Sequence, residues 1–103
     1  MLQHALEQQL KTYSLTFDDH LLSFTRKGFE ISFQAGDLIE VEPTEEISFG
    51  KLILLELNGQ YLLRRFEKNL GGSFFPPLPI SGDCKVVGLA VNRIRNSSRF
   101  PIS

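Results

Sequence analysis

The stretch KLILLELNGQYLLRRF, residues 51–66, places two apolar runs on either side of Asn58-Gly59. An Asn-Gly pair between apolar runs is typical of a two-residue hairpin, because both turn positions take a positive φ there. The sequence therefore predicts a β-hairpin over residues 51–66.

Alternation of apolar and polar residues predicts further strands on both sides of this hairpin. Upstream, Phe29, Ile31 and Phe33 alternate with polar neighbours, and residues 38–41 form another short apolar run. Residues 85–94 form a last strand that is apolar on both sides in its first half, which is typical of a central strand or one covered by another subunit. The expected fold class is a compact, mostly antiparallel β domain.

Both ends of the chain are predicted to differ from this β domain. Residues 1–13 carry apolar residues at helical spacing and predict a short amphipathic helix. The β domain is expected over residues 14–95, with residues 67–84 forming a loop inside it. Residues 96–103 are expected to be a loose polar tail.

Composition limits the classes of function. The chain has 103 residues, enough for one domain, and a formal net charge of −1, so we expect no bulk attraction to nucleic acid or to a membrane. Its single cysteine, Cys84, cannot form an internal disulfide, and no zinc-ligand spacing is present. No cofactor or metal is expected. The single thiol favours a reducing cytoplasm, and we find neither an apolar run of membrane length nor the pattern of a secretory signal.

Five segments follow one another in a fixed order and spacing: GDLIEVEP at 36–43, FGKLI at 49–53, LLRRF at 62–66, FPPLPI at 75–80 and VVGLAVNRIR at 86–95. This ordered set resembles the LexA/UmuD-type serine–lysine self-cleaving peptidase domain, the C-terminal domain of repressors of that family. The resemblance covers about residues 20–95. It implies a LexA C-terminal-domain-like antiparallel β fold.

The family's chemistry needs a serine upstream of the GDL element and a lysine on the second hairpin strand, which must be neutral to accept the serine proton. By the family's spacing, the serine position falls eight residues before Gly36, on Gly28, and the lysine position falls on Arg64. Glycine has no side chain to attack with, and arginine keeps its proton. The resemblance therefore implies a pseudo-peptidase that is degenerate at both catalytic positions, Gly28 and Arg64.

A second departure concerns the substrate segment. Family members that cleave themselves carry an Ala-Gly or Cys-Gly pair in an N-terminal segment, and no such pair precedes Tyr13. There is also no room for an N-terminal helix-turn-helix. A relocated dyad stays open as an alternative, with Ser23, Ser32 or Ser48 as nucleophile and Lys27 or Lys51 as base.

Other reactive residues favour simpler interpretations. His4 and His20 lie far apart in the sequence and in different residue patterns, so we predict no shared metal or catalytic role for them. Cys84 beside Lys85 could have a lowered pKa, but an unreactive small hydrophobe is favoured. Three arginines form a basic end, for which a solvated edge is favoured over a nucleic-acid site: Arg93, Arg95 and Arg99.

The resemblance also implies a function that needs no catalysis, because in this family the fold homodimerises through its C-terminal strand. The predicted dimer interface comprises Val86, Val87, Leu89, Val91 and Ile94, although the same residues could simply fill the monomer core. We expect a dimerisation and protein-interaction module that regulates a repressor or an SOS-type stress response in a bacterial or phage system. Its partners would be itself and a full-length repressor, with no direct nucleic-acid or membrane binding. The alternatives are a UmuD-like accessory subunit of a translesion polymerase and an active serine peptidase with relocated residues.

Overall fold

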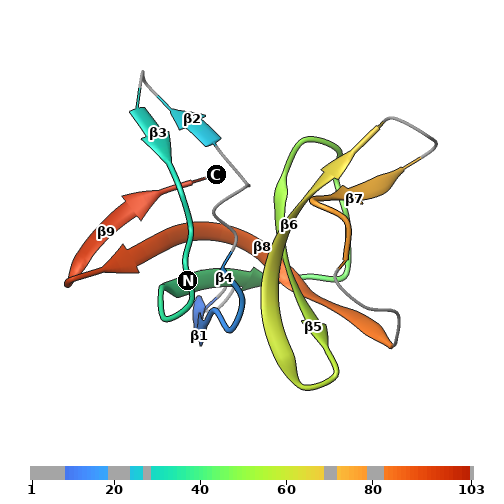
Figure 1. Ribbon diagram of the computed structural model, residues 1–103, viewed down its shortest axis with the longest axis horizontal. Coiled ribbons are helices and arrows are strands. Elements are labelled where there is room, and N and C mark those ends of the chain that lie inside the picture. Colours follow the sequence, from blue (N-terminus) through green and yellow to red (C-terminus); the bar gives the residue numbers. More distant parts are fainter. Residues whose placement is uncertain (1–8, 19–23, 27–28, 69–71, 79–82, 103) are drawn as a thin grey trace, which may run out of the picture.

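A computed structural model describes residues 9–18, 24–26, 29–68, 72–78 and 83–102. Within them the chain forms strands only (Figure 1). The strands are β1 (Lys11–Ser14), β2 (Phe24–Arg26), β3 (Phe29–Ile31), β4 (Leu38–Pro43), β5 (Leu52–Leu57), β6 (Gln60–Glu67), β7 (Ser73–Phe75), β8 (Cys84–Arg95) and β9 (Ser98–Pro101).

The main sheet runs in the order β1-β4-β8-β5-β6-β7, and β9 pairs with β8 beside this path. The strands β2 and β3 form a separate two-stranded ribbon. Every recorded pairing is antiparallel. The expected fold class, a compact and mostly antiparallel β domain, is confirmed.

The central hairpin forms as its turn residues predict. Asn58 and Gly59 adopt φ values of 53° and 81°, and the flanking residues Leu57 and Gln60 are directly paired. Asparagine tolerates this left-handed conformation better than most residues, and glycine adopts it without strain. The turn therefore sets the register of β5 against β6.

The apolar run at residues 52–55 of β5 is explained by burial on both faces of the strand. Leu52 and Leu54 belong to a core cluster that includes Phe33 and Ile39. The intervening residues contribute to a second cluster on the opposite face, made of Ile53, Leu55, Leu57 and Leu62. A strand with both faces covered has no reason to alternate with polar residues.

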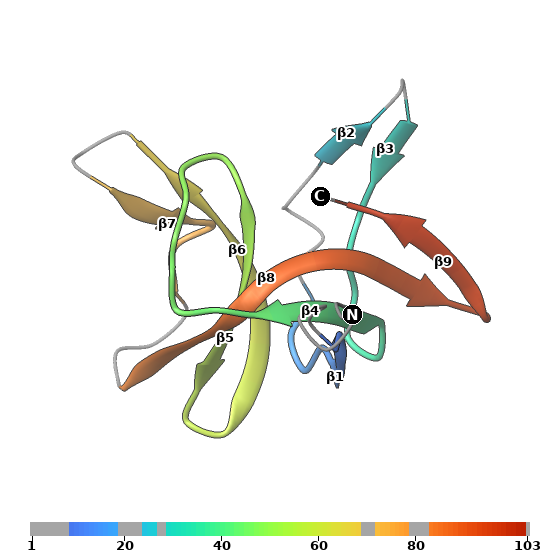
Figure 2. The same cartoon turned by 180° about the vertical axis from the view of Figure 1, so that it is seen from behind.

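The long strand β8 joins the two halves of the molecule and crosses most of its width (Figures 1 and 2). It pairs with β5 through its first half and with β4 and β9 through its second. Its register shifts twice, so that Val87 has no direct partner on β5 and Val91 has none on β4. Such bulges bend a strand and increase its twist, which allows β8 to serve both halves. The expectation that residues 85–94 form a central strand is confirmed, but this strand is not the last, because β9 follows it.

The expected N-terminal helix is wrong over its last residues. Residues 1–8 lie outside the described part, but Lys11–Ser14 form β1 and pair with β4. Tyr13 packs against the first core cluster, and its ring centroid lies 5.0 Å from that of Tyr61. Pairing with β4 and this aromatic contact override the helical spacing of the sequence.

The expected polar tail is also wrong over most of its length. Ser98–Pro101 form β9, and Ile102 is buried in the first core cluster with 2% of its surface exposed. The backbone N–H of Ile102 donates to the Val91 carbonyl at 2.8 Å. The polar residues of this segment gave no strand pattern in the sequence. The strand forms because it pairs with β8. Likewise β7 forms inside the predicted loop 67–84, where it pairs with β6.

Candidate functional site

Arg64 occupies the position that the resemblance assigns to the family's lysine. It lies on β6 opposite Ile53 and is 5% exposed. Its guanidinium donates from Nη1 to the Leu63 carbonyl at 2.6 Å and from Nη2 to the Pro77 carbonyl at 3.5 Å. A guanidinium has donors and no acceptor. The side chain at this position therefore works as a hydrogen-bond donor that ties β6 to the segment around Pro77.

Gly28, the predicted serine position, lies outside the described residues. The structure consequently does not place Gly28 relative to Arg64, and the loss of the serine at Gly28 stays a prediction. Ser23, Lys27, His4 and His20 lie outside the described residues as well.

Two residues of the relocated-dyad alternative come together in the structure. Ser48 and Lys51 both line a hollow of about 180 Å³ between the β4–β5 loop and the sheet. Both residues are exposed. The family's general base is a buried lysine, whose desolvation makes the neutral amine accessible. Exposed Lys51 lacks that environment, so the hollow does not reproduce the family's catalytic arrangement.

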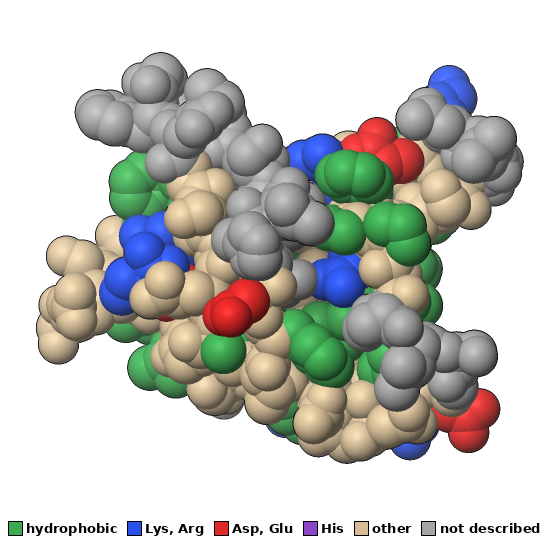
Figure 3. Space-filling model, viewed as in Figure 1, with side chains coloured by type: hydrophobic (Ala, Val, Ile, Leu, Met, Phe, Trp, Pro, Cys, Tyr) green, Lys and Arg blue, Asp and Glu red, His purple; other side chains and the backbone are tan. Residues whose placement is uncertain are grey.

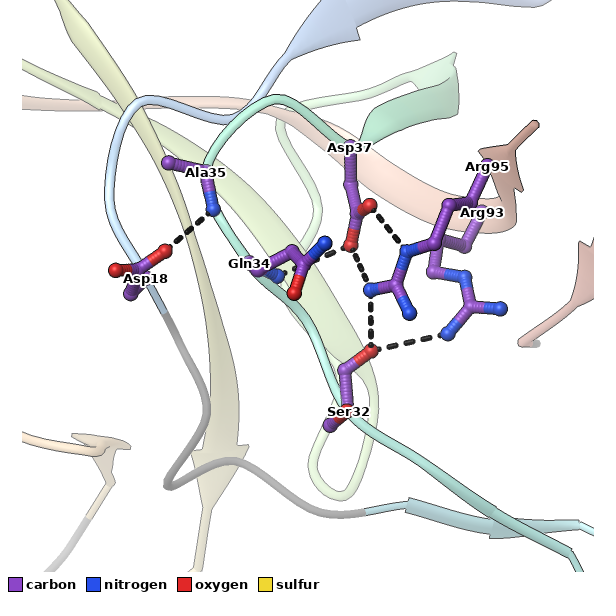
Figure 4. Close-up of polar contacts among 7 residues, drawn as sticks. All are labelled: Asp18, Ser32, Gln34, Ala35, Asp37, Arg93 and Arg95. Atoms are coloured by element: carbon purple, nitrogen blue, oxygen red, sulfur yellow. Dashed lines mark hydrogen bonds and ion pairs between the residues drawn. The ribbon is translucent and has the colours of Figure 1, made fainter.

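The remaining candidate nucleophile, Ser32, serves through its backbone (Figure 4). Its carbonyl accepts hydrogen bonds from Arg93 Nη1 at 3.0 Å and from Arg95 Nη2 at 3.3 Å. Ser32 thus holds two arginines of β8 beside the turn that precedes β4.

Asp37 is the anchor of that same turn. It is 3% exposed, and its carboxylate accepts two hydrogen bonds from Arg95, at 2.7 and 2.6 Å, and one from the Gln34 N–H at 3.0 Å. The hydrogen bond to Asp37 raises the pKa of Arg95, whereas desolvation chiefly lowers the pKa of Arg93. Paired charges at this depth are hydrogen-bonded because an unpaired one would be costly to bury.

The basic end of the chain is engaged within the molecule. Lys and Arg side chains gather over the β8–β9 end (Figure 3). Arg95 pairs with Asp37, Arg99 pairs with Glu40, and the Arg93 guanidinium lies over the Phe100 ring at 5.8 Å. These contacts favour the prediction of a solvated edge, because phosphate binding would have to compete with each of them.

The pair between Arg99 and Glu40 provides a test of this edge. A side-chain hydrogen bond from Arg99 holds the pKa of Glu40 below its usual range, and a bond from Asn92 acts in the same direction. Arg99→Ala should therefore raise the pKa of Glu40, measured by carboxyl ¹³C NMR titration. Because the folded-state pKa is lowered, the pair stabilises the fold at neutral pH and loses that contribution as the pH falls through this pKa. Unchanged Glu40 titration in the variant would contradict the pair, and Asn92→Ala should give a smaller shift.

Cys84 is an exposed free thiol at the start of β8. Partial desolvation raises its pKa, which is opposite to the shift that a reactive cysteine needs. The alternative of an activated thiol beside Lys85 is therefore not favoured.

The predicted dimer interface divides into two groups. Val86 and Leu89 pack against the second core cluster, and Val87 packs against the first, so these three residues partly fill the monomer core. Val91 and Ile94 are half-buried, and within the described residues neither belongs to a core cluster. Ile94 lies opposite Leu38, which is 39% exposed. The apolar surface still available to a partner on β8 is therefore concentrated at its second half.

Sequence reasoning missed an aromatic cluster at the β6–β7 end, where hydrophobic side chains show on the surface (Figure 3). Phe49 stacks on Phe66 with ring centroids 5.0 Å apart, and Phe74 meets Phe66 at 5.3 Å. The only sequence signal was the high phenylalanine content, because these three residues come from a loop and two strands.

The described residues contain no group of three or more His, Cys, Asp and Glu side chains suited to a metal ion. They also include no helix that is long and apolar enough to cross a bilayer. No protein-family model matches the chain, and a comparison with curated proteins finds no match.

Proposed function

We propose that this protein is a non-catalytic domain of the LexA/UmuD type that acts by binding proteins, with itself as one partner. The observation that carries the proposal is Arg64. Its buried guanidinium lies at the position of the family's proton acceptor and donates to two backbone carbonyls. A group that is permanently a donor cannot take a proton from a nucleophile.

The order of the strands supports the proposal without deciding it. The GDL-like segment runs into β4, the hairpin segments form β5 and β6, and the last apolar segment forms the central strand β8. On this proposal the domain regulates a full-length repressor of the same fold in the cytoplasm, by pairing with it or by competing for its dimer partner.

The absence of catalysis is tested by incubation with candidate repressors. The purified chain should cleave neither itself nor a repressor at neutral or alkaline pH, followed by mass spectrometry over hours. A self-cleaving member of the family, run in parallel, serves as the positive control. Any specific cut that Arg64→Ala or Ser48→Ala abolishes would contradict the proposal.

Self-association is tested by sedimentation velocity across a range of concentrations. The wild-type chain should dimerise, and Ile94→Asp should shift it toward monomer, because an unpaired carboxylate at an apolar seam is costly to bury. Phe75→Asp is the matched control, since Phe75 is a 44% exposed apolar residue on β7, at the far edge of the sheet. A wild-type chain that stays monomeric would remove homodimerisation from the proposal.

A further inference from the structure

We infer that the hollow beside the β4–β5 loop receives a lysine or arginine side chain of a partner protein. The hollow is lined by Glu42, Thr44, Glu46, Ser48, Lys51, Ile53 and Leu89. The inference rests on the proposed protein-binding function and adds to it the place and the chemistry of contact.

The shape of the hollow fits one long side chain. Its volume is about 180 Å³. Its accessible apolar lining is Leu89, which is half-buried on β8, because the neighbouring Ile53 on β5 is fully buried. Lysine and arginine lay their aliphatic stems along apolar surface while the charged head stays at a polar rim. An apolar lining beneath a polar rim suits that amphipathic form.

The charge of the hollow selects a cation. Glu42 and Glu46 bring two carboxylates to it, against one ammonium from Lys51. Within the described part of the chain, neither glutamate takes part in a recorded ion pair, whereas Asp37, Glu40 and Glu67 each pair with an arginine. Glu42 and Glu46 are thus two carboxylates without a recorded arginine partner that lie where an apolar lining is also present.

The loop that forms the rim is anchored against the sheet. The Glu46 N–H donates to the Thr44 hydroxyl at 3.0 Å, and the Gly50 N–H donates to the Phe66 carbonyl at 2.6 Å. Phe49 stacks on the same Phe66. The C-terminal end of the loop is therefore held against β6, and the Thr44 hydroxyl orders the turn at Glu46, so less backbone ordering entropy opposes binding.

The hollow lies beside the first half of β8, where Leu89 lines it, and not beside Val91 and Ile94, where apolar surface remains for self-association. A partner that lies along this first half would bring its basic side chain against Leu89 and the two glutamates. Charge complementarity of this kind fixes the register of an interface and speeds association.

The test is a ¹⁵N NMR titration of the full chain with the capped peptide Gly-Ser-Arg-Ser-Gly and with its citrulline counterpart, which is of the same shape but uncharged. The arginine peptide should shift the amides of Ser48, Lys51 and Leu89 saturably. The citrulline peptide should bind about fivefold more weakly or not at all, as expected for the loss of a partly exposed ion pair. Equal binding of the two peptides, or shifts scattered over the surface, would overturn the inference.

Variants test whether binding depends on the carboxylates of this hollow or on the general acidity of the surface. The double variant Glu42→Gln with Glu46→Gln should weaken the arginine peptide about fivefold. Glu56→Gln is the control, because Glu56 lies on β5, which also contributes Ile53 to this hollow, but lines a different hollow, and it should leave binding unchanged. If Mg²⁺ alone produced the same shifts and blocked the peptide, the hollow would be an ion site and the assignment to a side chain would fall. Shifts of the same amides on dilution without peptide would assign the hollow to a second copy of this chain instead.

The outcome is independent of the sedimentation test. A chain that dimerises but does not bind the arginine peptide keeps the proposed function and loses this inference. A monomeric chain that binds the peptide keeps the hollow and loses the homodimer.

Discussion

Gly88→Ala should cost this protein about 3 kcal/mol or more of its free energy of unfolding, at the upper end of what overpacking a core usually costs. Gly88 lies in the middle of β8, paired with Pro43 on β4 and with Leu54 on β5. A Cβ atom there would lie 2.5 Å from Val41 Cγ1 and closer still to the carbonyl oxygen of Glu42. Because one of these neighbours is backbone, β4 itself would have to move. Urea unfolding followed by circular dichroism measures the loss.

Gly36→Ala is the control for this prediction. Gly36 has φ +95°, and a Cβ atom there meets nothing within 4 Å. Its cost is conformational strain alone, about 1–2 kcal/mol. A Gly88 variant no less stable than the Gly36 variant would mean that β4 and β8 do not approach as closely as the structure places them.

Asp37→Ala should cost about 3 kcal/mol, the lower end for breaking a buried ion pair, because the Arg95 side chain is 29% exposed and can recruit water. The substitution removes the acceptor for two Arg95 hydrogen bonds and for the Gln34 N–H, which loosens the turn before β4 (Figure 4). Thermal and urea unfolding measure the loss. Asp37→Asn should cost less, because an amide oxygen still accepts one of these bonds.

Salt dependence distinguishes this buried pair from an exposed one. Added sodium chloride should leave the Asp37→Ala loss nearly unchanged, since buried pairs are screened little. The smaller loss in Arg99→Ala should shrink with salt, because the Arg99 side chain is 61% exposed. Equal salt sensitivity of the two losses would show that Asp37 is not held away from water.

Sequence reasoning could predict only part of the proposed site. Arg64 could be singled out from its place on the hairpin, because the Asn58-Gly59 turn fixes the count along β6. Its hydrogen bond to Pro77 could not, since it joins residues 13 positions apart across an irregular segment. The hollow at Glu42 and Leu89 could not be predicted for the same reason: its lining comes from a loop and three strands, β4, β5 and β8, which only pairing through β8 brings together.

The sequence by itself determined the antiparallel β class, the central hairpin and the strand over residues 85–94, for which a central place was predicted. These follow from short-range signals: residue alternation, positive φ at Asn58 and Gly59, and apolar residues on both faces of a strand. Tertiary structure alone decided that residues 11–14 and 98–101 are strands and that Ile102 is buried. Both segments are short and polar, and each is stabilised by pairing with a strand already anchored in the core, β1 with β4 and β9 with β8. The partner of β1 lies far along the chain, so residues 11–14 carry no local pattern for it. The strand β9 instead follows β8 directly through the positive-φ turn Asn96-Ser97, and its polar residues form a strand because the free energy that stabilises it belongs to the pair.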